Sequence, residues 1–357
     1  MAHVVPADSS TSTVPRIDTR RWLTLVLVLG GTFMTFFDLS VVNVAIPTVQ
    51  RDLHASFAQV QFVIAGYALT YAVTLITGGR LGDIYGRKRV FMLGMAGFTL
   101  ASALCGFAPS PDLLIGARLI QGLAAAVMTP QVLSIIQVTF TPEVRSRALG
   151  IFGAVVGVAA MLGQVLGGLI IRANLFGFSW RPIFLVNLPV GIGALAAATF
   201  LLAESRSATA RRLDLGGVCI VTLGLFLLIY PLVEGREAGW PLWTWLCLLA
   251  ALPVLVAFVA FEQWMTKKVG SPLVVLRLFR LPAFVAGLRV QCAFTCANAA
   301  FLFTLALYLQ LGLHFSALAA GLTFGPAPVA VLIVAPLAGK LAADLGRRLI
   351  VSGIALL

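Results

Sequence analysis

Charged residues are scarce in this chain, and acidic residues are the scarcest. Only 11% of the 357 residues are charged, and the 13 Asp and Glu compare with 25 Lys and Arg. A soluble domain carries charge on about a quarter of its residues. The low charge, together with 60% hydrophobic residues and a mean hydropathy of +1.01, excludes an ordinary soluble protein. Because the apolar runs are continuous rather than alternating, we predict an all-α polytopic membrane protein and not a β-barrel.

The motifs of cofactor and metal chemistry are also missing. The sequence contains no glycine loop for nucleotides, no zinc motif and no nucleophile triad, so we expect no enzymatic activity, no cofactor and no metal site. Energy would come from an ion gradient rather than from ATP. The cysteines all lie in apolar runs without metal-ligand spacing, and we interpret them as small apolar core residues. They are Cys105, Cys219, Cys247, Cys292 and Cys296.

Long apolar runs fill the remaining sequence. A run needs about 20 residues to cross roughly 30 Å of hydrocarbon. Ten runs qualify: 22–46, 58–77, 90–108, 113–138, 148–171, 183–203, 215–232, 242–261, 283–309 and 317–338. An eleventh run begins at residue 349. The first run is too long for the apolar part of a signal peptide, so we expect it to stay as a membrane helix.

The basic residues alternate between the two sides of these spans. With the N-terminus inside, 19 Lys and Arg fall in inner segments, four in outer segments and two within spans. Cytoplasmic loops carry the excess of Lys and Arg in membrane proteins. The pattern therefore predicts a cytoplasmic N-terminus, and it explains the net charge of +12 without a nucleic acid partner.

The segment 79–89, which reads GRLGDIYGRKR, joins the second and third runs. Its charges exclude it from lipid, and its glycines allow tight turns, so we predict a cytoplasmic loop. We expect Asp83 to cap the next helix and Arg87 to pair with an acid such as Glu143; topology and solvation alone are the alternative. A degenerate copy, GKLAADLGRR, occupies 339–348 after the tenth run, and such repeats are typical of secondary transporters.

These residues carry a family resemblance. The segment 79–89 resembles the signature between helices 2 and 3 of the major facilitator superfamily, with Gly79, Asp83, Gly86, Arg87 and Lys88 at its main positions. In that fold the signature recurs six helices later, whereas here the copies are eight spans apart. The spacing is similar to that of the 14-helix drug:proton antiporter branch. Further segments resemble signatures of that branch in the same order: 37–47, 118–122, 157–168 and 179–189.

The resemblance implies a domain organisation. We expect a cytoplasmic tail (1–21), an N-terminal six-helix bundle (22–203), two linker transmembrane helices with inner loops (204–281) and a partial C-terminal bundle (282–357). The chain departs from the family in stopping inside the ninth helix of the core, which predicts an incomplete C-terminal bundle. It also departs at Gly163, which is followed by Gln164 where the antiporter signature usually has proline.

Two charges lie within the apolar runs that carry these signatures. Asp38 lies deep in the first run, where a carboxylate costs about 2.5–3.5 kcal/mol on insertion scales. We predict that it binds the coupling proton; a structural hydrogen bond is the alternative. Arg118 lies in the fourth run with Gln121 three residues on. Arg118 either modulates a nearby carboxylate or snorkels outward.

The fifth run contains the segment 157–168, which resembles the antiporter signature of the branch. Gly157, Gln164 and Gly168 share one helix face, and Gly163 and Gly167 form a GxxxG pair. Small residues let helices approach closely, so packing alone is a sufficient explanation. The alternative is that this face slides against the other half of the protein during transport.

The resemblance implies a function. It is secondary active export of drugs or amphipathic small molecules across the cell inner (plasma) membrane, driven by a proton gradient without a cofactor. The expected partners are the lipid bilayer, a small-molecule substrate and protons. The alternatives are a truncated, non-transporting membrane protein or a fragment of such a transporter, and uptake in place of export.

Overall fold

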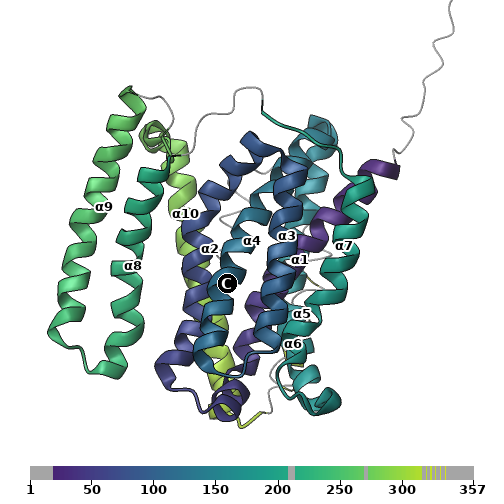
Figure 1. Ribbon diagram of the computed structural model, residues 1–357, viewed down its shortest axis with the longest axis vertical. Helices are drawn as coiled ribbons and strands as arrows, with labels where there is room; N and C mark the ends of the chain where they lie inside the picture. The colour runs from purple at the N-terminus through teal and green to yellow at the C-terminus, as the bar shows by residue number, and fades with distance from the viewer. Residues whose placement is uncertain are drawn as a thin grey trace, which may run out of the picture.

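The computed structural model describes residues 19–207, 214–268 and 272–315, with six single residues between 319 and 334. Within these residues the chain is helical (Figure 1). The helices are α1 (Thr19–Leu53), α2 (Phe57–Tyr85), α3 (Arg87–Gly106), α4 (Pro111–Thr139), α5 (Pro142–Ala173), α6 (Pro182–Leu185), α7 (Asn187–Leu201), α8 (Leu215–Ala238), α9 (Leu242–Lys268) and α10 (Pro282–Leu307). Short turns η1 (Leu175–Gly177), η2 (Leu276–Arg280) and η3 (Tyr308–Gly312) complete the order.

The helices follow the predicted spans. Among the described residues, eight segments have the length and hydropathy to cross a membrane, and they coincide with the first eight predicted runs, α6 and α7 together forming the sixth. Helix α10 covers the ninth run. The tenth and eleventh runs and the second loop copy, 339–348, lie outside the continuously described residues. The helices extend beyond the runs because a helix continues into polar turns where hydropathy has already fallen.

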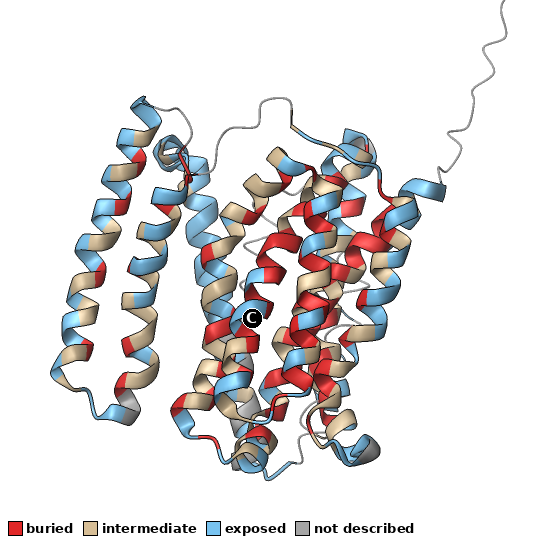
Figure 2. Ribbon diagram, viewed as in Figure 1, coloured by how far each residue is buried: buried red, intermediate tan, exposed pale blue. Residues whose placement is uncertain are grey.

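Helices α1 to α7 form the packed part of the molecule. Helix α4 lies between α2 and α3, and α1 packs along α5. Buried residues concentrate in α1, α3 and α4 (Figure 2). In the central apolar window of α1 and of α4, 67% of the residues are buried, against 11% in α9. The exposed apolar surface of α8 and α9 is therefore surface for lipid.

Helices α8 and α9 form a hairpin that lies beside α2 (Figure 1). An aromatic contact joins the two elements: the Phe62 ring of α2 lies 5.5 Å from the Tyr230 ring of α8. The Tyr230 ring lies in turn 5.6 Å from Trp243 of α9. The rings are one of the contacts by which α8 packs on α2. The division of the hairpin from the bundle as a linker unit stays a prediction.

The segment 79–89 is not an extended loop, and this part of the sequence prediction is wrong. Helix α2 runs through Tyr85 and α3 starts at Arg87, so Gly86 alone separates them, with a φ of +108° that favours glycine. The backbone at Gly79 is helical and makes no turn, because this part of α2 packs against α4. Gln131 of α4 donates from Nε2 to the carbonyl of Gly78 at 2.7 Å.

The GxxxG pair of α5 packs on α1. A Cβ atom on Gly163 would lie 2.7 Å from the Phe37 carbonyl oxygen, and one on Gly167 would lie 2.8 Å from Val41. The packing explanation therefore applies to Gly163 and Gly167, which let the two helix backbones approach closely.

This contact predicts opposite effects of alanine at two glycines of α5. Gly163→Ala is expected to lower the free energy of unfolding by about 1–2 kcal/mol, because the new methyl group overlaps the α1 backbone. Gly153→Ala is the matched control, since a Cβ there meets nothing within 4 Å; it should raise stability by about 0.5–1 kcal/mol through helix propensity. Denaturation of the detergent-solubilised protein measures both, and equal effects would contradict the close contact.

The cysteine interpretation holds for one residue only. Cys105 is buried, whereas Cys219, Cys292 and Cys296 are exposed and Cys247 is intermediate. The interpretation as core residues is wrong for the exposed three, because an apolar helix in a membrane carries small apolar residues on its lipid face as well as inside.

Candidate functional site

Asp38 lies near the middle of α1 and is wholly buried. Its Oδ2 atom forms a salt bridge with Nη1 of Arg118 on α4, and both side chains are completely removed from solvent. Its Oδ1 atom accepts from Nε2 of Gln121 at 2.9 Å. The three residues selected from the sequence therefore meet at one point, although 80 positions separate Asp38 from Arg118.

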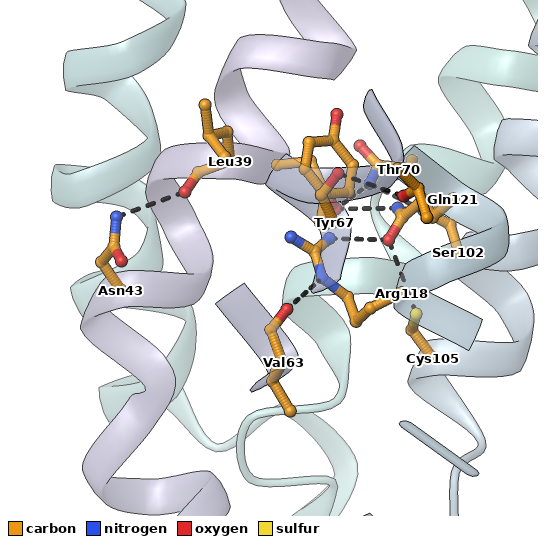
Figure 3. Close-up of polar contacts among 11 residues, drawn as sticks. Leu39, Asn43, Val63, Tyr67, Thr70, Ser102, Cys105, Arg118 and Gln121 are labelled. Carbon is orange, nitrogen blue, oxygen red and sulfur yellow. Dashed lines mark hydrogen bonds and ion pairs between the residues drawn. The ribbon is translucent and has the colours of Figure 1, made fainter. Parts of the chain in front are cut away.

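Arg118 does not snorkel. Its Nε atom donates to the Val63 carbonyl of α2 at 3.1 Å, and Nη1 also donates to Oε1 of Gln121 at 2.7 Å (Figure 3). The guanidinium carbon lies 4.2 Å from the centre of the Tyr67 ring, a distance at which a cation is attracted to the ring face. Within the described residues, Nη2 of Arg118 has no hydrogen-bond partner.

Gln121 connects the charged pair to α3. Its Nε2 atom donates to Oγ of Ser102 at 2.7 Å, and its Oε1 atom accepts from the Cys105 thiol at 3.5 Å (Figure 3). Gln121 lies one turn after Arg118 on the same face of α4. The amide therefore fixes the positions of both charges, because it accepts from the cation and donates to the carboxylate.

Sequence reasoning assigned no role to four further residues of this cluster: Tyr67, Ser102, Cys105 and Asn187. Asn187 begins α7, and its Nδ2 atom donates to Oδ1 of Asp38 at 3.3 Å and to Ser102 at 3.0 Å. A search for every polar side chain inside an apolar run would have found Ser102 and Asn187. No local pattern distinguishes Tyr67 or Cys105 from ordinary core residues.

This arrangement holds one positive and one negative charge in a dry environment. Removing two charges from water is costly, and only close pairing with further hydrogen bonds compensates for it. Asp38 has these bonds from Arg118, Gln121 and Asn187. Neutralising Asp38 would remove the attraction and leave a buried cation. The contacts of this one carboxyl group join α1 to α4 and α7.

The face of α5 that carries Gly157, Gln164 and Gly168 lies towards the end of α10 and η3 rather than towards α1. Met161, one turn after Gly157, packs against Leu309 of η3, against which Leu305 at the end of α10 also packs. Gln164 is half-buried and Gly168 is buried. The sliding of this face against the other half stays a prediction, and Met161 is where η3 reaches it.

The charged end of α2 makes other contacts than those expected. Asp83 does not cap α3; its Oδ1 atom forms an i,i+4 ion pair with Arg87 at 3.0 Å. The cap comes from Glu204, after α7, which accepts from the backbone N–H of Lys88 at 3.2 Å and of Arg89 at 3.3 Å. The Asp83 carboxylate is satisfied by Arg87, the first residue of α3, so the pair spans the junction at Gly86. The side chain of Glu143 lies outside the described part of the chain.

The comparison with known families agrees with this geometry. The family model described as "Major Facilitator Superfamily" matches residues 28–357. The chain belongs to the major facilitator superfamily. The all-α polytopic membrane fold predicted from the sequence is confirmed, and the chain is a multi-pass membrane protein.

Curated relatives resemble the chain over nearly its whole length. It is 42% identical over 353 residues to the "Probable actinorhodin transporter" of Streptomyces coelicolor, covering 99% of this chain and 61% of that protein. It is 35% identical over 323 residues to the "Tetracenomycin C resistance and export protein" of Streptomyces glaucescens, covering 90% and 58%. It is 38% identical over 333 residues to the "Puromycin resistance protein pur8" of Streptomyces alboniger, covering 92% and 64%. The chain thus spans about three fifths of the length of these relatives.

Solved structures support the fold. The proton:xylose symporter XylE of the major facilitator superfamily aligns with a TM-score of 0.62 at 14% identity, covering 92% of this chain and 70% of that one. The peptide transporter POT aligns with a TM-score of 0.59 at 17% identity, covering 91% and 69%. At these identities the likeness concerns the fold of the superfamily.

Proposed function

We propose that this protein is a secondary active transporter that exports drugs or amphipathic small molecules from the cell and takes its energy from a proton gradient. The relatives named for antibiotic transport, export and resistance support the substrate class. The observation that carries the proposal is the buried pair of Asp38 and Arg118 in the middle of the bundle. A pair of charges at this depth is costly to insert and is typical of a site for protons or ions.

In this proposal Asp38 is the proton-binding group. Protonation of its carboxyl group removes the negative charge that attracts Arg118. The guanidinium is then held by the Val63 carbonyl, Gln121 and the Tyr67 ring. Asp38, no longer charged, binds α4 and α7 less tightly, and α1 becomes free to change its packing between the two access states.

The remaining parts of the proposal concern placement in the membrane. The 19 basic residues of inner segments against four of outer segments support a cytoplasmic N-terminus in the cell inner membrane. The proposed partners are the bilayer, a small-molecule substrate and protons. The second candidate function is that of a membrane protein that does not transport, and the vesicle experiment below separates the two.

Replacement of Asp38 tests the coupling directly. In vesicles with an imposed proton gradient, Asp38→Asn is expected to abolish uphill export. The amide cannot bind and release the coupling proton as a carboxylate does. Downhill exchange of substrate should persist, since it needs no proton binding. The exposed Asp52 at the C-terminal end of α1 provides the matched control. Asp52→Asn should transport as the unchanged protein does.

Two outcomes would contradict the proposal. Full gradient-driven export by Asp38→Asn would show that Asp38 does not bind the coupling proton. Absence of any substrate movement in the unchanged protein, with normal insertion in the membrane, would favour the non-transporting candidate. The amount of each variant in the membrane is measured in parallel, so that loss of transport is separated from loss of folding.

A further inference from the structure

A buried pair of acidic residues lies outside the Asp38 site. It consists of Asp214, which precedes α8 and is 4% exposed, and Glu262 of α9, which is 0% exposed. Both lie where α8 begins and α9 finishes, at the top of the hairpin in Figure 1. The charged C-terminal turns of α2 lie at the same side of the molecule.

Each carboxyl group uses one oxygen for the backbone. Oδ1 of Asp214 accepts from the N–H of Gly217 at 2.8 Å and so caps α8. Oε2 of Glu262 accepts from the N–H of Val274 at 2.8 Å. We call residues 272–275, between α9 and η2, the strap. Glu262 therefore holds the strap against α9.

The other two oxygens face each other. Oδ2 of Asp214 and Oε1 of Glu262 have no donor among the described residues. Both converge on one point, because a Cβ atom on Gly217 would lie 2.6 Å from each of them, so the two oxygens are at most twice that distance apart. Two buried like charges this close destabilise each other, and a proton shared between the two oxygens would satisfy both.

The strap has a second attachment on the bundle. Arg80, in the charged end of α2, donates from Nη2 to the Pro272 carbonyl. The strap is thus held by Arg80 on one side and by Glu262 on the other, and the two attachment points are two residues apart. The acidic pair thereby connects the hairpin to the signature segment of α2 through four residues.

Charged groups around the pair are few in the described part of the chain. Arg80 from α2 is committed to the strap carbonyl. Lys267 and Lys268 at the end of α9, and Arg277 and Arg280 in η2, are exposed, and Lys268 lies 5.7 Å from the Trp264 ring. Arg211 and Arg212 precede Asp214 in the sequence and lie outside the described residues. Among the described residues no ion pair joins these cations to Asp214 or Glu262.

We propose that Asp214 and Glu262 form a second proton-binding site, distinct from Asp38, in which one shared proton keeps the strap fastened between the hairpin and the signature end of α2. When the proton is present, Oε2 of Glu262 holds the Val274 amide. When the proton leaves to water at this end of the molecule, the two like charges repel each other and the strap is released. The fastened state is therefore favoured at low pH and lost as the pH rises.

Hydrogen–deuterium exchange of the Val274 amide tests this site, with the chain in lipid nanodiscs and variants compared at matched pH. In the unchanged protein, protection of the strap should fall from mildly acidic to mildly alkaline pH. Glu262→Gln and Asp214→Asn should keep protection throughout, because each amide donates where the shared proton stood. At alkaline pH their strap should exchange about tenfold more slowly than that of the unchanged protein, the factor typical of one retained hydrogen bond.

Control variants separate this role from a merely structural one. Glu262→Ala removes the acceptor and should leave the strap unprotected at every pH. Glu234→Gln, at the opposite end of α8, should leave unchanged the fall in protection of the Val274 amide between acidic and alkaline pH. The proposal would be overturned if protection of the Val274 amide fell with pH in Glu262→Gln as much as in the unchanged protein. Protection that follows added Na⁺ or Mg²⁺ at fixed pH would also overturn it, because the bound species would then be a metal cation.

Discussion

Replacing Arg118 with leucine is expected to lower the free energy of unfolding by about 3–5 kcal/mol, the usual cost of leaving a buried charge unpaired. Asp38 would keep its bonds from Gln121 and Asn187 but would lose its only cation among the described residues. Water does not reach the site to compensate, because both side chains are fully buried. Denaturant unfolding in detergent, followed by tryptophan fluorescence, measures the loss.

The double variant identifies the cause of that loss. Asp38→Asn combined with Arg118→Leu leaves no charge in the site, so much of the stability should return. An interaction energy of this kind appears as non-additivity in a double-mutant cycle. If the double variant lost the sum of the two single effects, the salt bridge would not be the source of the cost.

Gly78→Ala is expected to lower the free energy of unfolding by about 2–3 kcal/mol, the upper part of the range for overpacking a close contact. A Cβ atom on Gly78 would lie 2.3 Å from the carbonyl oxygen of Ala126 and 2.9 Å from Cα of Val127, both in α4. Backbone atoms in the middle of a helix cannot move aside as a flexible side chain does. Helices α2 and α4 would therefore have to separate along their contact.

The neighbouring glycine provides the control. A Cβ on Gly79 would lie 3.6 Å from the Pro130 side chain, an ordinary contact, so Gly79→Ala should be tolerated. Unfolding of both variants in the same detergent, with the amount in the membrane as a second measurement, checks the difference. Equal tolerance of the two alanines would mean that α2 and α4 are farther apart than this structure has them.

Local sequence was sufficient for the first nine spans and for noticing Asp38 and Arg118. Lipid offers the backbone no hydrogen bonds, so an apolar run in a membrane is helical wherever it lies in the chain. An ionisable residue in such a run is rare enough to be noticed without any knowledge of its neighbours. The family signatures add order to these observations, and the match of the superfamily model over 28–357 confirms the family.

Contacts between distant helices were the part that could not be predicted. The sequence left open whether Arg118 snorkels, and it gave Asn187 and Ser102 no role, because an uncharged polar residue in a span has many ordinary uses. It also predicted a loop where α2 continues to Tyr85. The charges of 79–89 do exclude it from lipid, but they do not prevent a helix whose glycines pack against α4.

The sequence alone determined that the chain crosses the membrane repeatedly, which residues are unusual inside it and, through the arrangement of basic residues, the orientation we propose. Hydropathy and charge act residue by residue against the bilayer, so they can be determined locally. Only the tertiary structure decided that Asp38 pairs with Arg118, that Glu204 caps α3, and that the 79–89 segment is tied by Arg80 to the strap beside Asp214 and Glu262. Each of these contacts joins segments that are distant in the chain, and its energy depends on distance and burial that no single segment specifies.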